Sequence, residues 1–186
     1  MKLKKYNAVL SILSTLTLLI HVGYNVFAYV FFFYHPMAKT LTTLPFLLIV
    51  CGHAICGMCS VFLLEDGTHP AMYPRQNAGT IIQRVSAALI FPLLIIHMYS
   101  YSLLAQSANG KMWLFITVIV LQILFFAVIA SHVAVSFSKA FITLGLLSDV
   151  HKKKVVDTLI IYACAILFVL SSFCVVRGEI VMFLVL

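Results

Sequence analysis

The stretch MWLFITVIVLQILFFAVIASHVAVSF, residues 112–137, decides the fold class, because it is almost entirely apolar and contains no charged side chain. About 20 consecutive apolar residues in an α-helix cross a hydrocarbon core about 30 Å thick. Four more runs meet this criterion, and the five predicted spans lie near residues 8–34, 42–64, 80–104, 112–137 and 155–176. The sequence therefore predicts an all-α integral membrane protein built as a five-helix bundle.

The composition supports this class. The 186 residues are 63% hydrophobic and 9% charged, with a mean hydropathy of +1.14, and a chain of this composition does not stay dispersed in water. Five spans and short links use almost the whole length. Residues 1–186 are thus predicted to form a single transmembrane domain, with no room for a soluble domain of ordinary size. Such a chain works inside the bilayer or binds a larger partner there.

Basic residues predict the orientation of the chain. Lys2, Lys4 and Lys5 precede an apolar stretch about twice as long as the core of a secretory signal, so we expect this stretch to be retained as the first helix. Nine of the 12 Lys and Arg residues fall on the side of the amino terminus. The positive-inside rule then places the amino terminus in the cytoplasm and the carboxyl terminus outside. This asymmetry and attraction to anionic lipid explain the net charge of +7, so no nucleic acid partner is expected.

Two links between spans provide most of the predicted cytoplasmic surface. They run from Glu65 to Gly79 and from Leu144 to Lys154. The links on the other side of the membrane are shorter. With the basic amino terminus, the two cytoplasmic links form the only surface on that side large enough to receive a partner protein.

Four histidines lie one apiece in four of the five predicted spans: His21, His53, His97 and His132. Ionisable side chains inside a membrane are costly and usually functional. At about 1.5 Å per residue, His21 and His97 lie roughly 20–25 Å above the cytoplasmic ends of their spans. The same rise places His53 near the middle of the membrane or below it, and His132 clearly in its lower part. Because two imidazoles at one depth on facing helices suit the axial positions of a haem, we predict an outer pair, His21 with His97, and an inner pair, His53 with His132.

Residues beside the inner pair could complete a haem site. Gly52, Ala54 and Gly57 are small and flank His53, which would leave space for a porphyrin. Haem propionates need cationic or hydrogen-bonding partners near an interface. The inner candidates for such contacts, or for contacts with a quinone, are Gln83, Arg84, Ser86 and Lys139. Two alternatives stay open: charged residues here can be snorkelling or topogenic, and a single intramembrane histidine can be structural.

The cysteines offer a different interpretation. Cys56 and Cys59 form a CxxC motif, and membrane thiol oxidoreductases that reduce quinones carry such pairs at a bilayer face. Here the motif lies inside the second apolar run and no second pair occurs in a link, which favours apolar packing. A haem-free thiol:quinone oxidoreductase remains one alternative function. A structural anchor with fewer haems is another.

Several stretches carry a resemblance to a known family. The most specific is Gln83-Arg84-Val85-Ser86-Ala87 leading to His97, and the next is Gly52-His53-Ala54-Ile55-Cys56-Gly57. Looser matches are Leu19-Ile20-His21 with Asn25, Ser131-His132, and Arg177 with its flanks. Over almost its entire length the chain resembles the single-chain, five-helix cytochrome b subunit that anchors di-haem succinate dehydrogenases and fumarate reductases.

The resemblance implies an electron-transfer subunit with no catalytic residue of its own. It implies two b-type haems, ligated by the first- and third-span histidines and by the second- and fourth-span histidines. The implied partners are an iron–sulfur subunit, an FAD-containing subunit with the dicarboxylate site, membrane lipid and a quinone, with menaquinone as the expected type. The implied location is the bacterial cytoplasmic membrane.

The sequence also departs from the family pattern. Residues 35–41 contain no acid that could take quinol protons. Ala130 stands two residues before His132, where some di-haem fumarate reductases place a glutamate for proton return. His35 and Glu179 are the remaining candidates for proton exchange near the outer face. These departures leave the site of quinone chemistry open.

Overall fold

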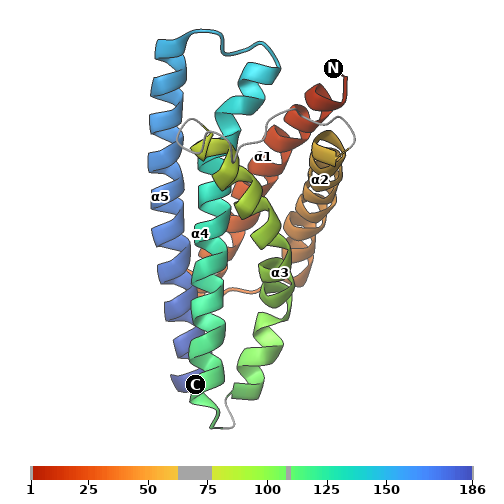
Figure 1. Ribbon diagram of the computed structural model, residues 1–186. Coiled ribbons are helices and arrows are strands. Elements are labelled where there is room, and N and C mark those ends of the chain that lie inside the picture. Colours follow the sequence, from red (N-terminus) through yellow and green to blue (C-terminus); the bar gives the residue numbers. More distant parts are fainter. Residues whose placement is uncertain (1, 63–76, 108–109, 186) are drawn as a thin grey trace.

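A computed structural model describes residues 2–62, 77–107 and 110–185, and they form five long helices (Figure 1). The helices are α1 (Lys2–Phe31), α2 (Pro36–Phe62), α3 (Ala78–Ser107), α4 (Met112–Thr143) and α5 (Val150–Ile180), and a π-helical turn, η2 (Val181–Val185), continues α5. Each of the five has 27 to 32 residues and is apolar enough to cross a membrane. The predicted all-α fold with five spans is confirmed.

The helices extend beyond the predicted apolar runs at most of their ends. At about 1.5 Å per residue they are roughly 40–48 Å long, so each reaches past the hydrocarbon core into the interfacial regions. Backbone hydrogen bonds satisfy a helix in water as well as in lipid, so polar end residues continue it. Phe32, at φ 51°, follows the end of α1, and Pro36 begins α2 at the position where proline is favoured.

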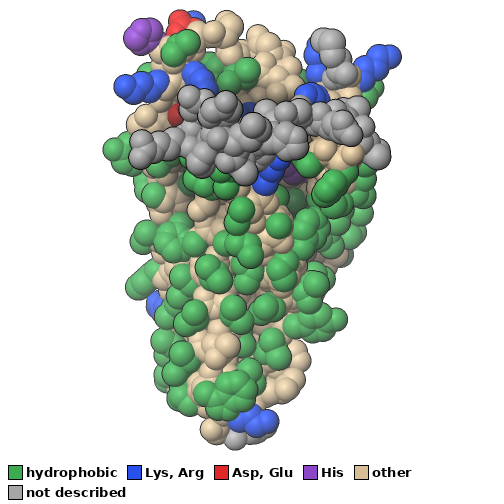
Figure 2. Space-filling view, viewed as in Figure 1, with side chains coloured by type: hydrophobic (Ala, Val, Ile, Leu, Met, Phe, Trp, Pro, Cys, Tyr) green, Lys and Arg blue, Asp and Glu red, His purple; other side chains and the backbone are tan. Residues whose placement is uncertain are grey.

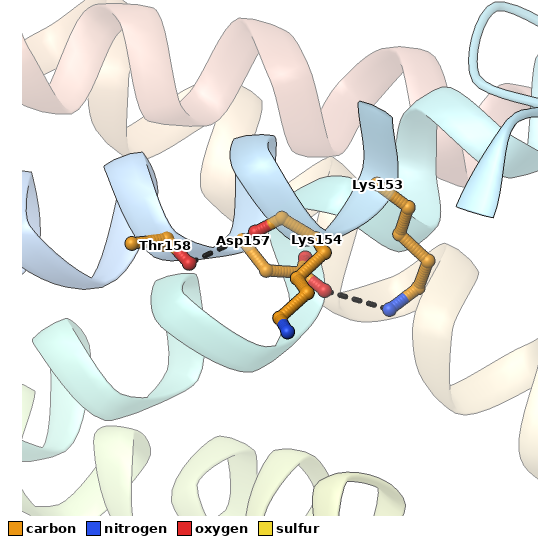
Figure 3. Close-up of polar contacts among 4 residues, drawn as sticks. All are labelled: Lys153, Lys154, Asp157 and Thr158. Atoms are coloured by element: carbon orange, nitrogen blue, oxygen red, sulfur yellow. Dashed lines mark hydrogen bonds and ion pairs between the residues drawn. The ribbon is translucent and has the colours of Figure 1, made fainter. Parts of the chain in front are cut away.

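The start of α5 shows how local sequence fixes a helix end. The side chain of Asp149 caps the helix and accepts hydrogen bonds from the backbone amides of His151 at 2.7 Å and Lys152 at 3.3 Å. One turn further on, Lys153 Nζ lies 2.6 Å from Asp157 Oδ2 (Figure 3). The link expected from Leu144 to Lys154 is therefore short, because α5 already begins at Val150. Most of the other predicted link, residues 65–79, lies outside the described residues.

Most packed neighbours run antiparallel, and α1 and α5 run parallel (Figure 1). Helix α1 packs on α2, α3 packs on α4, and α4 and α1 contact each other and α5. Helices α2 and α3 thus lie at the flanks of the bundle, each held closely by one neighbour (Figure 1). Two apolar clusters join α3 to α4: Leu93 with Phe125 and Val128, and Leu104 with Phe115 and Val118. The two chain termini lie at opposite ends of the bundle.

The surface is typical of a protein embedded in lipid. Large apolar side chains are exposed on all five helices. In Figure 2 they cover the middle of the bundle, and Lys and Arg side chains gather mainly at the end where α1 begins. The buried polar residues are mostly serines, such as Ser14, whose hydroxyl bonds a carbonyl of its own helix. The chain is therefore a multi-pass membrane protein in contact with membrane lipid.

Candidate functional site

The four intramembrane histidines are half-buried and project between helices. His53 on α2 and His132 on α4 lie together, with ring centroids 6.4 Å apart and ring planes at 66°. Imidazole nitrogens bind metal ions at about 2 Å, and a ring centroid lies about 1 Å behind its nitrogen, so two imidazoles on one metal ion have centroids roughly 6 Å apart. The separation of this pair fits joint ligation of one metal ion.

Hydrogen bonds set the tautomer of His132. Its Nδ1 lies 3.2 Å from the backbone carbonyl oxygen of Gln83 and 3.0 Å from Ser86 Oγ. A carbonyl oxygen only accepts, so Nδ1 carries the proton and donates it. The Ser86 hydroxyl can also accept, because its own proton is donated to the carbonyl of Ile82 at 2.6 Å. Nε2 of His132 therefore keeps its lone pair, as a metal ligand requires.

Lys139 is linked to the inner pair through one intervening residue, Gln83. Lys139 Nζ donates to Gln83 Oε1 at 2.7 Å and contacts the carbonyl oxygen of Gly79 at 3.4 Å. Gln83 thus bonds Lys139 through its side chain and His132 through its backbone. Arg84 is half-buried on the same turn of α3 and makes contacts of its own. Three of the four residues predicted to contact haem propionates or a quinone lie together near His132: Gln83, Ser86 and Lys139.

The outer histidines have the same tautomer. His97 Nδ1 lies 2.7 Å from Gln122 Oε1, and Gln122 is only 2% exposed. His21 Nδ1 lies 3.3 Å from Thr43 Oγ1, while its Nε2 accepts from Asn25 Nδ2 at 3.2 Å. The amide of Asn25 is oriented by a second bond, from Nδ2 to the backbone carbonyl of His21 at 2.7 Å. Nε2 of both outer histidines is therefore the unprotonated nitrogen.

The outer pair is less closely assembled than the inner pair. In the described part of the chain, the ring contacts of His21 and His97 are with phenylalanines. His21 stacks on Phe46 with centroids 5.4 Å apart, and His97 packs on Phe125 at 5.0 Å. Asn25 also occupies Nε2 of His21. The inner pair is the better-formed candidate metal centre.

Both histidine pairs join helices that are not close backbone neighbours. His53 and His132 connect α2 with α4, and His21 and His97 connect α1 with α3. Neither combination is among the helix pairs that pack most closely. A flat cofactor would have to lie between such helices, so this placement suits a porphyrin. The ligand set also fits haem b, which takes two neutral imidazole nitrogens.

The small residues beside His53 face another helix. A Cβ added to Gly52 would lie 3.7 Å from the Leu10 side chain, and one added to Gly57 would lie 3.9 Å from Asn7 Oδ1. Both glycines therefore face α1 and let it approach α2. Around His53, the space expected for a porphyrin must come from the side of α4, where His132 lies.

The remaining candidates lie apart from the histidine pairs. Cys56 and Cys59 are free thiols one turn apart on the unbroken helix α2. Near the other end of the bundle, Glu179 on α5 is buried and accepts a 3.4 Å hydrogen bond from the Tyr29 hydroxyl on α1. His35 is exposed in the link before α2, and its backbone bonds the Tyr24 hydroxyl.

Sequence reasoning missed two partners of the outer histidines, Gln122 and Thr43. Gln122 had a visible signal, because it is the one amide in the most apolar span and a polar side chain there needs a hydrogen-bond partner. Thr43 had none, since threonines commonly bond the backbone of their own helix, as Thr42 does at the carbonyl of Ala38. Rotation of α2 about its axis decides which of the two faces His21.

The fold and the site define a class: a multi-pass membrane protein in which two intramembrane histidines of different helices, His53 and His132, lie together. Comparisons of the chain with protein-family models, with curated proteins and with solved structures find no match. A more specific function is therefore inferred from the residues of this chain.

Proposed function

We propose that the chain is the membrane anchor and electron-transfer subunit of a succinate:quinone or quinol:fumarate oxidoreductase, with two bis-histidine haems b. The observation that supports this proposal best is the inner pair: the imidazoles of His53 and His132 lie 6.4 Å apart on different helices, and the carbonyl of Gln83 leaves Nε2 of His132 free to ligate. The sequence resemblance supports the rest.

Each residue of the inner site has a role in this proposal. His53 and His132 would hold the haem iron, and the bound haem would supply one-electron redox chemistry. The Gln83 carbonyl and Ser86 hydroxyl hold the His132 ring in one tautomer and orientation. Lys139 and Arg84 are the cations of this region that would be available to propionate carboxylates. The apolar helices around the pair exclude water.

The outer site uses the same chemistry with one adjustment. His21 and His97 would hold its iron, and the buried amide of Gln122 orients His97 through the 2.7 Å bond. Asn25 must turn away from Nε2 of His21 before that nitrogen can ligate. A quinone, with menaquinone as the expected type, exchanges electrons at the membrane. Two redox sites at different depths shorten the distance that an electron crosses in a single step.

We further propose that the chain lies in a bacterial cytoplasmic membrane with its amino terminus in the cytoplasm. The basic side chains gathered where α1 begins support this orientation through the positive-inside rule. That end would bind the iron–sulfur subunit. The FAD-containing subunit with the dicarboxylate site would bind the same end directly, or would be held by the iron–sulfur subunit. The physical reason is that electrons must enter at the end nearest the inner haem.

The experiment is a haem count on the purified full-length chain with one substitution and one control. The unsubstituted chain should hold two haems b, counted as the pyridine haemochrome, and the absorption spectrum of the native protein should be that of low-spin, six-coordinate haem. His132→Ala should lower this count to one, while His151→Ala should leave it at two, because His151 is exposed at the start of α5. A count of zero for the inserted, unsubstituted chain would contradict the proposed function.

A further inference from the structure

One of the four histidines differs from the others in its hydrogen bonds. Three of them have a side-chain or backbone partner at Nδ1: His21 bonds Thr43, His97 bonds Gln122, and His132 bonds Gln83 and Ser86. Nδ1 of His53 is buried and has no hydrogen-bond partner of acceptable geometry. A metal-bound imidazole almost always donates its second nitrogen to an acceptor. His53 therefore needs an acceptor that the other three already have.

A second buried atom without a hydrogen bond lies in the same helix interface. It is Oδ1 of Asn7 on α1. This oxygen lies 3.9 Å from the Cβ position of Gly57, which is one turn beyond His53 on the same face of α2. The backbone of Asn7 lies close enough to act on the His53 imidazole as a hydrogen-bond acceptor, but its geometry makes no hydrogen bond to Nδ1. A buried donor on α2 and a buried acceptor on α1 thus face the same narrow region.

The two unsatisfied atoms are chemically complementary. An imidazole N–H donates, an amide oxygen accepts, and each loses free energy when it is buried without a partner. The absent side chain of Gly57 leaves room for the Asn7 amide to move toward His53. A hydrogen bond between them requires the amide and the imidazole to rotate toward each other.

We propose that Asn7 is the positioning residue of the inner haem: its Oδ1 accepts the hydrogen bond from Nδ1 of His53 while Nε2 of His53 ligates the iron. This inference depends on the proposed function. The bond fixes the tautomer of His53 and makes its imidazole a stronger electron donor. A stronger donor favours ferric over ferrous iron, so Asn7 lowers the reduction potential of the inner haem.

The test is a redox titration of both haems in the purified full-length chain carrying substitutions at Asn7. Asn7→Ala removes the acceptor and should raise one of the two midpoint potentials and weaken haem retention at that site about 10- to 100-fold. Asn7→Asp supplies a stronger acceptor and should lower the same potential. A tenfold change in the ferric-to-ferrous binding ratio corresponds to about 59 mV for one electron. The other haem serves as the internal reference.

The control is Ser14→Ala, which removes another buried polar group of α1 that bonds only its own helix. It should leave both potentials unchanged. Shifts of Asn7→Ala and Asn7→Asp in the same direction, or no shift in either with both haems bound, would overturn the role of Asn7 and leave the proposed function standing. If Asn7→Ala does not insert, the shift in Asn7→Asp alone decides. Absence of haem from the unsubstituted chain overturns the proposed function itself.

Discussion

Replacing Gly178 by alanine should destabilise the contact between α5 and α1. A Cβ at this position would collide with Cδ1 of Tyr29 and lie 3.0 Å from Cε1 and 3.2 Å from Cγ of the same ring. These are atoms of a rigid ring, and the ring is held at its far end by the hydrogen bond from the Tyr29 hydroxyl to Glu179. The ring can move aside only by breaking this bond.

The magnitude follows from three terms. Overpacking of a filled site costs about 1–3 kcal/mol. Loss of the only hydrogen bond described for the buried carboxyl of Glu179 costs about 1–3 kcal/mol more. Alanine gains up to about 1 kcal/mol over glycine in a helix. A net loss of about 3 kcal/mol would lower the melting temperature by roughly 6–12 °C for a chain of this size.

Thermal unfolding in detergent, followed by circular dichroism, measures this effect. Gly23→Ala on α1 is the matched control, because no heavy atom lies within 4 Å of its added Cβ. Its melting temperature should be unchanged or slightly higher. In a Tyr29→Ala background, Gly178→Ala should cost little, since the clash is gone. If Gly178→Ala and Gly23→Ala have the same melting temperature in the protein that keeps Tyr29, then Tyr29 does not pack on Gly178 and the reasoning fails.

Three further predictions concern the site and the orientation. The double substitution Cys56→Ser with Cys59→Ser should leave two haems bound and electron transfer to quinone intact, and loss of quinone reduction alone would support the thiol interpretation. His21→Ala combined with His97→Ala should cost no more haem than either single change, because both residues serve one site; loss of both haems from the inserted double variant would show that the pairs are drawn wrongly. A cysteine at Ser148, in a variant without the native cysteines, should react with an impermeant thiol reagent only from the cytoplasmic side, and reaction from outside would reverse the proposed orientation.

The number and type of spans could be predicted because one physical quantity decides them. A helix in lipid must present apolar side chains over the thickness of the hydrocarbon core, and each apolar run of this chain meets that requirement without help from its neighbours. Helix ends were harder to predict, since they depend on local bonds such as the Asp149 cap and the positive φ of Phe32. The π-helical turn after Ile180 carries no signal in the sequence.

The sequence could predict the depth of the histidines in the membrane but not how each helix is rotated about its axis. The rise per residue placed both His53 and His132 at the middle of the membrane or below it, and the structure has their rings side by side. Which groups surround them depends on how each helix is turned about its axis, which side-chain packing fixes. The backbone carbonyl that orients His132 could not be foreseen, because any residue has one. The glycines beside His53 were expected near a porphyrin and instead face α1.

The diagonal placement of the histidine pairs has a thermodynamic consequence for assembly. Direct packing holds α2 and α3 from one side only, since each has one close neighbour. A cofactor bound by histidines of α2 and α4 would join α2 to a second helix. Another bound by those of α1 and α3 would do the same for α3. Any ligand that binds only the assembled state stabilises it by mass action. Haem supply in the cell would then govern how long the inserted chain survives proteolysis, and chains deprived of haem would expose α2 and α3 first.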